Sequence, residues 1–498
     1  MSFNKFVLLL TWGFVFLISI SSYSKLVELD YDAFLIPLLH PIIFFLTIHK
    51  ILVEFLYDKI WFTLENIHLF FLYIMLGFGS ISYIVFLRQD LTSPFQFSPT
   101  VANKSISLVL IGITVYRIAS YLLKTKLSYN INLPKIDKKP IYLIFLFTIA
   151  LKILLFTFGG ASYGASFIQQ AGTSISPIFN YISYISQMNL IVLIIMSFYF
   201  FSEKSNLFSK KIYFSFVGIS IFLSLATGYK EDLLDVIFAI LIPYSLLQIT
   251  QFSSFKIDKK YFIITISFLL LFTMIFPIIR YFYFFVRFSP YSVFDLLPNM
   301  NKDSFLEIYS VIGSNEGTNF LTAGIFTLLK RLTSFEYLCA AVQFTPEVYP
   351  FFNFEKYSSI FIYSIIPRVI WPSKPLHFTG IDFTFNYKSG TGLVSESTNP
   401  TIIGWGYLES GIIGVVLVMI FLALISTIVN YWIILGERNS LFKIILSSYL
   451  FMHFFSIEND LFYAISSALI PIVIILIFLT LYYLLNSIFL KRLRFSIE

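Results

Sequence analysis

The sequence predicts an all-α, polytopic membrane protein with about twelve transmembrane helices and one large extracytoplasmic loop. Of its 498 residues, 58% are hydrophobic and 12% are charged, and that charged share is about half of what soluble domains carry. The mean hydropathy is +0.84. Apolar stretches of about 20 residues, the length that crosses a bilayer, recur along the chain. Together these observations exclude a soluble globular domain.

The apolar stretches give the expected spans in order. The first is interpreted as a retained helix rather than a signal peptide, because no small-residue cleavage site follows it. The second contains Pro37 and Pro41, and the eleventh is short. The expected spans cover residues 6–23, 33–49, 62–87, 105–123, 141–158, 180–201, 212–228, 233–250, 261–284, 402–433, 441–456 and 461–486.

The distribution of Lys and Arg between the loops predicts the orientation. Cytoplasmic loops carry an excess of these residues. The loops after spans four, six and eight and the C-terminus are basic, whereas the alternate loop 159–179 has no Lys or Arg. We therefore expect both termini in the cytoplasm. The basic residues are Lys124, Lys126, Lys135, Lys138, Lys139, Lys204, Lys210, Lys211, Lys256, Lys259, Lys260, Lys491, Arg492 and Arg494.

The chain is expected to divide into residues 1–284 with spans one to nine, an extracytoplasmic loop over 285–400, and residues 401–498 with spans ten to twelve. A loop of about 115 residues is too long for a plain linker. Within it, 319–344 is predicted to be a helix that carries Lys330 and Arg331. The apolar run 357–366 is too short to span and predicts an interfacial or re-entrant segment.

Several function classes are disfavoured by what the sequence lacks. Cys339 is the only cysteine, so no intrachain disulfide can form, and the five histidines are scattered without metal-ligand spacing. No phosphate-binding glycine loop and no Ser/His/Asp arrangement is visible. The net charge of +7 fits basic cytoplasmic loops, so no nucleic-acid partner is expected.

The stretch PRVIWPSKP, residues 367–375, is unusual in so apolar a chain. Residues that precede proline are disfavoured in helices, so this strip is expected to be extended or turning. Trp371 favours the headgroup layer. Arg368 offers a rigid donor fork suited to phosphate and Lys374 a point charge. The alternative is an interface anchor that binds lipid headgroups without specificity.

Further cations fall on the outer side, where Lys and Arg should be scarce. A substrate that carries a diphosphate would explain them. Each cation also has an alternative role. Arg280 and Arg287 end span nine, where a long side chain can snorkel. Arg331 can cap a helix end or pair with Glu336, and Lys230 can pair with neighbouring acids. Within spans four and five, Arg117 and Lys152 are expected to snorkel. The outer cations are Arg280, Arg287, Lys330, Arg331, Lys230, Arg368 and Lys374.

Candidates for a general base lie on the same side. Glu409 is near the outer end of span ten, and a carboxylate in a membrane helix is a functional candidate. The alternative places Glu409 on a helix that starts in the loop, partnered by a hydroxyl. Glu396 and His377 are the other candidates, with Glu316 and Asp382 as further acids. A lone loop histidine such as His377 can also be a surface residue.

The layout resembles the Wzy-type O-antigen and oligosaccharide repeat-unit polymerases. The resemblance is carried by TGYKEDLLD at 227–235, by PRVIWPSKP, and by STNPTIIGWGYLESGIIG at 397–414. It implies an architecture like that of GT-C polymerases and ligases in the bacterial inner membrane. It also implies transfer of a growing glycan from undecaprenyl diphosphate to the next lipid-linked repeat unit, without cofactors. The implied partners are undecaprenyl-diphosphate-linked glycans, membrane lipid and a chain-length-regulating co-polymerase.

On this hypothesis preplaced cations stabilise the departing diphosphate, and a carboxylate or imidazole accepts the proton of the attacking hydroxyl. The cations are Arg368, Arg331, Arg280 and Lys230, with Arg287 and Lys374. The bases are Glu409, Glu396 and His377, with Glu409 ranked first. Two alternatives stay open: an oligosaccharide ligase, which uses another acceptor, and a flippase or exporter, for which half-chain symmetry would be expected.

Overall fold

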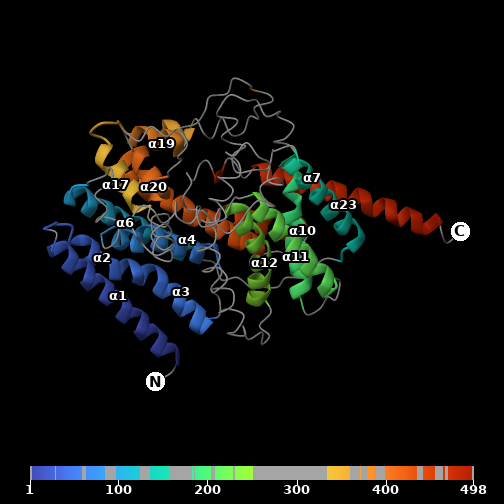
Figure 1. The fold of residues 1–498 in the computed structure, drawn as a ribbon, viewed down its shortest axis with the longest axis horizontal. Coiled ribbons are helices and arrows are strands. Elements are labelled where there is room, and N and C mark those ends of the chain that lie inside the picture. Colours follow the sequence, from blue (N-terminus) through green and yellow to red (C-terminus); the bar gives the residue numbers. More distant parts are fainter. Residues whose placement is uncertain are drawn as a thin grey trace, which may run out of the picture. The chain divides into compact units, whose positions relative to one another are not determined.

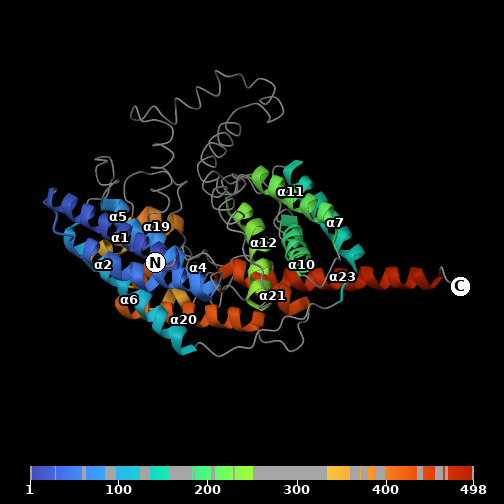
Figure 2. The ribbon, with the colours of Figure 1, turned by 90° about the horizontal axis from the view of Figure 1, so that it is seen from below.

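The computed structural model describes 3–28, 30–58, 63–84, 97–123, 135–157, 182–183, 185–202, 208–227, 230–250, 334–358, 371, 380–387, 399–434, 441–454, 464–465 and 469–495. The chain divides into two compact units, each described by itself. Unit 1 comprises Met1–Asp137, Ile242–Gln251 and Leu332–Glu498, and unit 2 comprises Lys138–Leu241 and Phe252–Arg331. Figures 1 and 2 show the helices in two views.

The regular elements in the described ranges are all helical, which confirms the predicted all-α class. Over these ranges, five helices are long and apolar enough to cross a membrane. They correspond to expected spans one to four and ten. The five are Asn4–Glu28, Leu35–Tyr57, Leu64–Ser82, Pro99–Leu123 and Thr401–Val429.

Helices also lie at most of the other expected spans. The exception is span nine, 261–284, which lies outside the described residues. The bounds are α7 Lys138–Thr157, α10 Met188–Phe201, α11 Lys210–Thr227, α12 Lys230–Thr250, α21 Leu441–Phe454 and α23 Leu469–Phe495. Because α12 begins at Lys230, most of the expected outer loop 227–235 is helical. Within the described part of the large loop, helical residues form α17 Phe335–Phe344, α19 Gly380–Tyr387 and a stretch at 355–358.

The second span is helical from Leu35 to Asp58 despite its two prolines. It contains two wide turns, each with the hydrogen-bond pattern of a π-helix, so its pitch changes along its length. In order it consists of α2 Leu35–Phe44, η1 Phe45–His49, α3 Lys50–Val53 and η2 Glu54–Asp58. The third span is built the same way, from α4 Leu64–Leu72, η3 Tyr73–Phe78 and α5 Gly79–Ser82.

The core of unit 1 forms around α6, Pro99–Leu123, and α20, Thr401–Ile434, which pack against each other. The first span, α1 Phe3–Glu28, packs on α2, and α2 packs on α6 (Figures 1 and 2). A Cβ on Gly112 of α6 would lie 3.0 Å from Cδ1 of Ile403. The glycine therefore lets α20 approach α6 closely, as small residues do between membrane helices.

Two buried histidines join the spans of unit 1. A ring nitrogen of His68 lies 3.1 Å from the Tyr116 hydroxyl and 3.0 Å from the Ser426 hydroxyl, which joins α4, α6 and α20. His40 lies 2.9 Å from the Ser19 hydroxyl and 3.0 Å from that of Tyr73, which joins α1, α2 and η3. Apolar side chains alone cannot direct helix association in lipid, so such contacts help fix which helices meet.

The described helices of unit 2 include α7, α10 and α11, with α10 packed on both of the others. Aromatic stacking supplies part of this contact. Phe145 of α7 stacks on Phe216 of α11 with ring centroids 3.8 Å apart, and Phe200 of α10 stacks on Tyr213 at 4.1 Å. Aromatic side chains bury a large area, so these ring contacts help to hold α7, α10 and α11 together.

A candidate span is present at the predicted span ten, 402–433, but the helix there is not continuous. Inside α20, Ser410 has φ −160° and ψ 37°, and Gly411 has φ 61° and ψ −136°. A Cβ on Gly406 would lie 3.0 Å from the carbonyl oxygen of Gly414, although residues eight apart in a straight helix are separated by about 12 Å. The chain therefore turns sharply at Ser410–Gly411, and a short helix, Thr401–Glu409, folds against the start of the span.

We expect Gly414→Ala to destabilise the protein. The added Cβ would meet the carbonyl oxygen of Gly406, which is backbone and cannot move aside. Overpacking of this kind costs about 1–3 kcal/mol. The matched control is Gly13→Ala on α1, where a Cβ would meet nothing within 4 Å. Thermal unfolding in detergent should show a lower Tm for Gly414→Ala alone, and equal Tm values for both variants would contradict the sharp turn.

Cys339 tests the packing of α17, because its thiol is buried with 0% of the residue exposed. Burial raises the pKa of Cys339 from about 9 to about 12. At pH 8 the thiolate fraction should therefore fall from about one in ten to about one in ten thousand. Maleimide reacts with the thiolate, so mass spectrometry should find little labelling of the native protein and full labelling in SDS. Rapid native labelling would contradict this packing.

Candidate functional site

The structure describes one of the predicted catalytic side chains, Glu409. Lys230 is the first residue of α12, but the structure does not describe its side chain. The remaining predictions stay untested because their residues lie outside the described ranges. These are Arg368, His377, Glu396, Arg280, Arg287, Arg331 and Lys374.

Glu409 is the last residue of the short helix Thr401–Glu409, and it is 1% exposed. The side chains around it on this helix are also buried, including Trp405, Tyr407 and Leu408. The alternative interpretation, in which Glu409 lies on a helix that precedes the span, agrees with the turn at Ser410–Gly411. A carboxylate this deeply buried is uncommon in proteins unless it is paired.

Backbone hydrogen bonds hold the end of the short helix. The turn leaves carbonyl groups without the intrahelical partners that a continuous helix would give them. The N–H of Phe352 donates to the carbonyl of Leu408 at 3.0 Å, and the N–H of Asn353 donates to that of Glu409 at 2.8 Å. The loop after α17 therefore fixes the backbone that carries the Glu409 carboxylate.

A buried lysine lies beside the same helix. Lys356 is 8% exposed, and its Nζ lies 3.5 Å from the centroid of the Trp405 ring and 5.7 Å from that of Phe352. A cation over the face of tryptophan is stabilised by the ring quadrupole. Trp405 and Glu409 are four residues apart and so share one face of the helix. One face of the short helix thus carries a carboxylate and a ring that holds an ammonium group.

Aromatic and hydroxyl groups frame this region. The Tyr407 hydroxyl donates to the carbonyl of Thr345 at 3.2 Å, and the Thr345 hydroxyl lies 2.9 Å from that of Tyr387 on α19. Phe383 of α19 stacks on Tyr387 with centroids 4.7 Å apart and lies 6.0 Å from the Trp405 ring. These contacts connect α17, α19 and the start of α20, which lie together in Figure 1.

Unit 2 contains a second charged group of residues. Lys152 on α7 interacts electrostatically with Asp232 and Asp235, which lie in the first turns of α12. The sequence predicted only that Lys152 would snorkel. Lys230 and Asp232 both belong to the stretch 227–235 that carries the resemblance. The predicted diphosphate-binding cation, Lys230, is therefore close in sequence to acidic residues at the start of α12.

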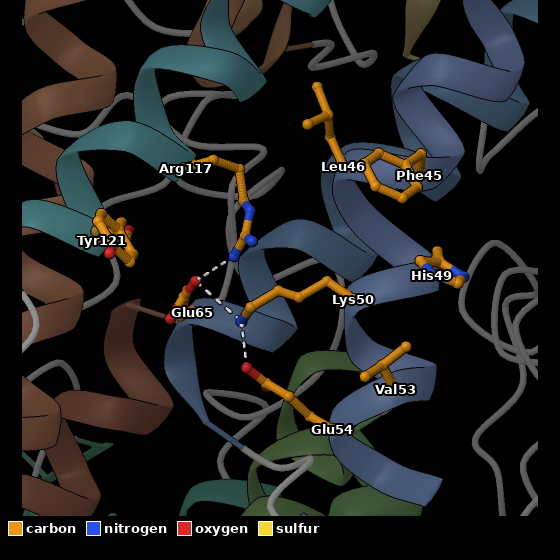
Figure 3. A pocket seen from close by; sticks show the side chains of 10 residues that line it. Phe45, Leu46, His49, Lys50, Val53, Glu54, Glu65, Arg117 and Tyr121 are labelled. Carbon is orange, nitrogen blue, oxygen red and sulfur yellow. Dashed lines mark hydrogen bonds and ion pairs between the residues drawn. The ribbon is translucent and has the colours of Figure 1, made fainter. Parts of the chain in front are cut away.

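Unit 1 also contains a charged cavity of about 380 Å³ (Figure 3). Lys50 lies at its centre: Nζ is 3.2 Å from Glu54 Oε1 and 2.9 Å from Glu65 Oε1. Arg117 Nη1 lies 2.9 Å from the same Glu65 oxygen. Arg117 therefore forms an ion pair instead of only snorkelling. The ends of spans two and four meet the start of span three here, as antiparallel neighbours should.

The sequence interpretation missed Lys356, Lys50 and Glu65. For Lys50 a signal existed, because Lys50 and Glu54 are four residues apart in an apolar helix and so lie on one face. No sequence signal pointed to Lys356, because its partner Trp405 is distant in sequence. Over the described residues, no group of three or more His, Cys, Asp or Glu side chains could hold a metal ion.

Comparison with known proteins shows a family for most of the chain. A family model described as a domain of unknown function, DUF8712, matches residues 14–487. No curated protein and no solved structure matches the chain.

Proposed function

We propose that this chain, which belongs to the DUF8712 family, polymerises lipid-diphosphate-linked oligosaccharide repeat units at the outer face of the cytoplasmic membrane. The observation that carries the proposal is Glu409, a buried carboxylate at the sharp turn between a short helix and the membrane span that follows it. Ionisable groups in membrane segments are functional candidates by default. Such a group can accept the proton of an attacking sugar hydroxyl.

The surroundings of Glu409 suit a base that must be held in place. The backbone of Glu409 is fixed by the N–H of Asn353, and the turn at Gly411 sets the direction of the span that follows. Lys356 supplies a positive charge along the same helix face. Ligand sites are usually lined by apolar and aromatic side chains with a few polar groups among them. The side chains around Glu409 are of this composition.

The proposed step is one displacement. The acceptor sugar hydroxyl gives its proton to Glu409 as its oxygen forms a bond to the anomeric carbon of the donor glycan. The bond between that carbon and the diphosphate oxygen breaks, and the lipid diphosphate leaves with the electron pair. Predicted outer-side cations, Arg368 foremost, stabilise the departing charge. Attack opposite the leaving group inverts the anomeric centre.

Glu409→Gln tests the proposed base, because glutamine keeps the shape and loses the proton acceptor. We expect the rate of polymer formation to fall about 10²–10⁴-fold. Glu347→Gln is the matched control, since Glu347 is an exposed carboxylate just after α17. Both variants are expressed in a strain that lacks the gene, and the surface polysaccharide is run on a gel beside an immunoblot for protein level. A normal ladder from Glu409→Gln at normal protein level would exclude Glu409 as the base.

Arg368→Ala tests the diphosphate hypothesis. We expect the long-chain ladder to disappear while single repeat units are still joined to their anchor, because charge stabilisation of the leaving group is lost. Lys25→Ala, on the exposed part of α1, is the control for loss of a cation. A normal ladder would refute the role of Arg368.

Deletion of the whole chain separates the alternatives. A polymerase leaves anchors that carry one repeat unit, a ligase leaves no capped anchor, and a flippase leaves lipid-linked repeat units on the cytoplasmic side. Only the first outcome agrees with the proposal.

A further inference from the structure

The charged cavity of unit 1 has no part in the proposed transfer step. It lies between α4, α6 and the segment from η1 to η2 (Figure 3). We propose that it binds the headgroup of a zwitterionic phospholipid with a primary ammonium group, of the phosphatidylethanolamine class.

The charges of the cavity favour a ligand that carries both a positive and a negative charge. Lys50 and Arg117 contribute two positive charges, and Glu54 and Glu65 contribute two negative charges. All four side chains are partly open, with exposed fractions of 13%, 30%, 19% and 17% in that order. The formal sum is zero, so a purely anionic headgroup gains no net attraction. A phosphate and an ammonium group in one ligand can each meet the opposite charge.

Arg117 is the group that would bind the phosphate. Its Nη1 is used by Glu65. Its Nε is buried and has no hydrogen-bond partner within the described part of the chain. Guanidinium groups bind phosphate through parallel N–H donors, and a buried donor without a partner is costly. A phosphate oxygen would satisfy this donor.

Glu54 is the group that would accept the ammonium. Its Oε1 lies 3.2 Å from Lys50 Nζ, and its Oε2 accepts from the Asn66 amide at 2.7 Å. A carboxylate has about four lone-pair positions, so both oxygens can accept further donors. A primary ammonium has three N–H donors, whereas a trimethylammonium has none. The carboxylate therefore favours ethanolamine over choline.

The position of the cavity indicates a lipid rather than a soluble molecule. Its walls belong to helices long and apolar enough to cross a membrane, Leu35–Tyr57, Leu64–Ser82 and Pro99–Leu123. Phe45 and Tyr121 line it and are 52% and 78% exposed, so apolar surface continues from the cavity to the outside of the helices. Its volume of about 380 Å³ lies within the usual range for small-ligand sites.

The two wide turns of the second span place the charges. Lys50 follows η1 directly, and Glu54 begins η2. Wide turns of this kind occur frequently at functional sites. Here they flank the single turn, α3, that carries the cation at the centre of the cavity.

Lipid competition on the wild-type chain is the first test. The protein is purified in mild detergent, mixed with equal amounts of phosphatidylethanolamine, phosphatidylcholine and phosphatidylglycerol of matched acyl chains, and examined by native mass spectrometry. We expect phosphatidylethanolamine to be retained at least about fivefold over the others, because it alone carries both a phosphate and a cation with N–H donors. Equal retention, or preference for phosphatidylglycerol, would overturn the proposal whatever the variants do.

Variants then test the residues. Arg117→Gln should reduce phosphatidylethanolamine retention about tenfold by removing the charge-assisted donors. Glu54→Gln leaves the cavity with a net charge of +1 and should shift preference to phosphatidylglycerol. Lys25→Gln breaks an exposed ion pair on α1 and is the control that should change nothing. A lower Tm for Arg117→Gln with unchanged lipid retention would mean that the ion pairs only hold helices together.

Discussion

Polar groups inside an apolar bundle must find partners within the protein, and the architecture of unit 1 depends on this constraint. Water cannot satisfy them at membrane depth. His68, Tyr116 and Ser426 meet from three helices that are far apart in sequence. Lys50, Glu65 and Arg117 do the same at the helix ends. Each set of contacts forms only when the right helices are adjacent, so these contacts select one packing among many that apolar side chains would permit.

The same constraint explains how a helix can be broken near Glu409. A sharp turn in a membrane helix releases carbonyl groups, and Phe352 and Asn353 supply the missing donors from the loop after α17. Glycine is needed at Gly411 because its φ of 61° is unfavourable for other residues. The proposed base therefore lies on a segment whose shape is maintained by a distant part of the chain.

Composition and periodicity were enough to predict the helical class, the first four spans and the approximate positions of later helices. They failed at Ser410–Gly411, because the stretch 401–434 is apolar throughout and hydropathy does not register a change of direction. Glu409 was identified from the sequence because a carboxylate stands out in an apolar run. Lys356 was not, because its significance comes from Trp405, and that contact exists only in the folded chain. The ion pair of Arg117 was missed for the same reason, since Glu65 lies on another helix.

The wide turns of the second span bear on how this helix tolerates changes in length. A π-helical turn closes its hydrogen bond one residue later than an α-helical turn, so η1 and η2 each accommodate an extra residue. Deleting one residue within Phe45–His49 would let that turn become regular and would keep the helix intact. Because the wide turn absorbs the extra residue, the parts of the helix on either side would keep nearly the same relative orientation after the deletion, and Lys50 would still face Glu65. A deletion within a wide turn should therefore be tolerated, whereas a deletion in the regular stretch Leu35–Phe44 would rotate the side chains on one side of it by about 100° relative to those on the other.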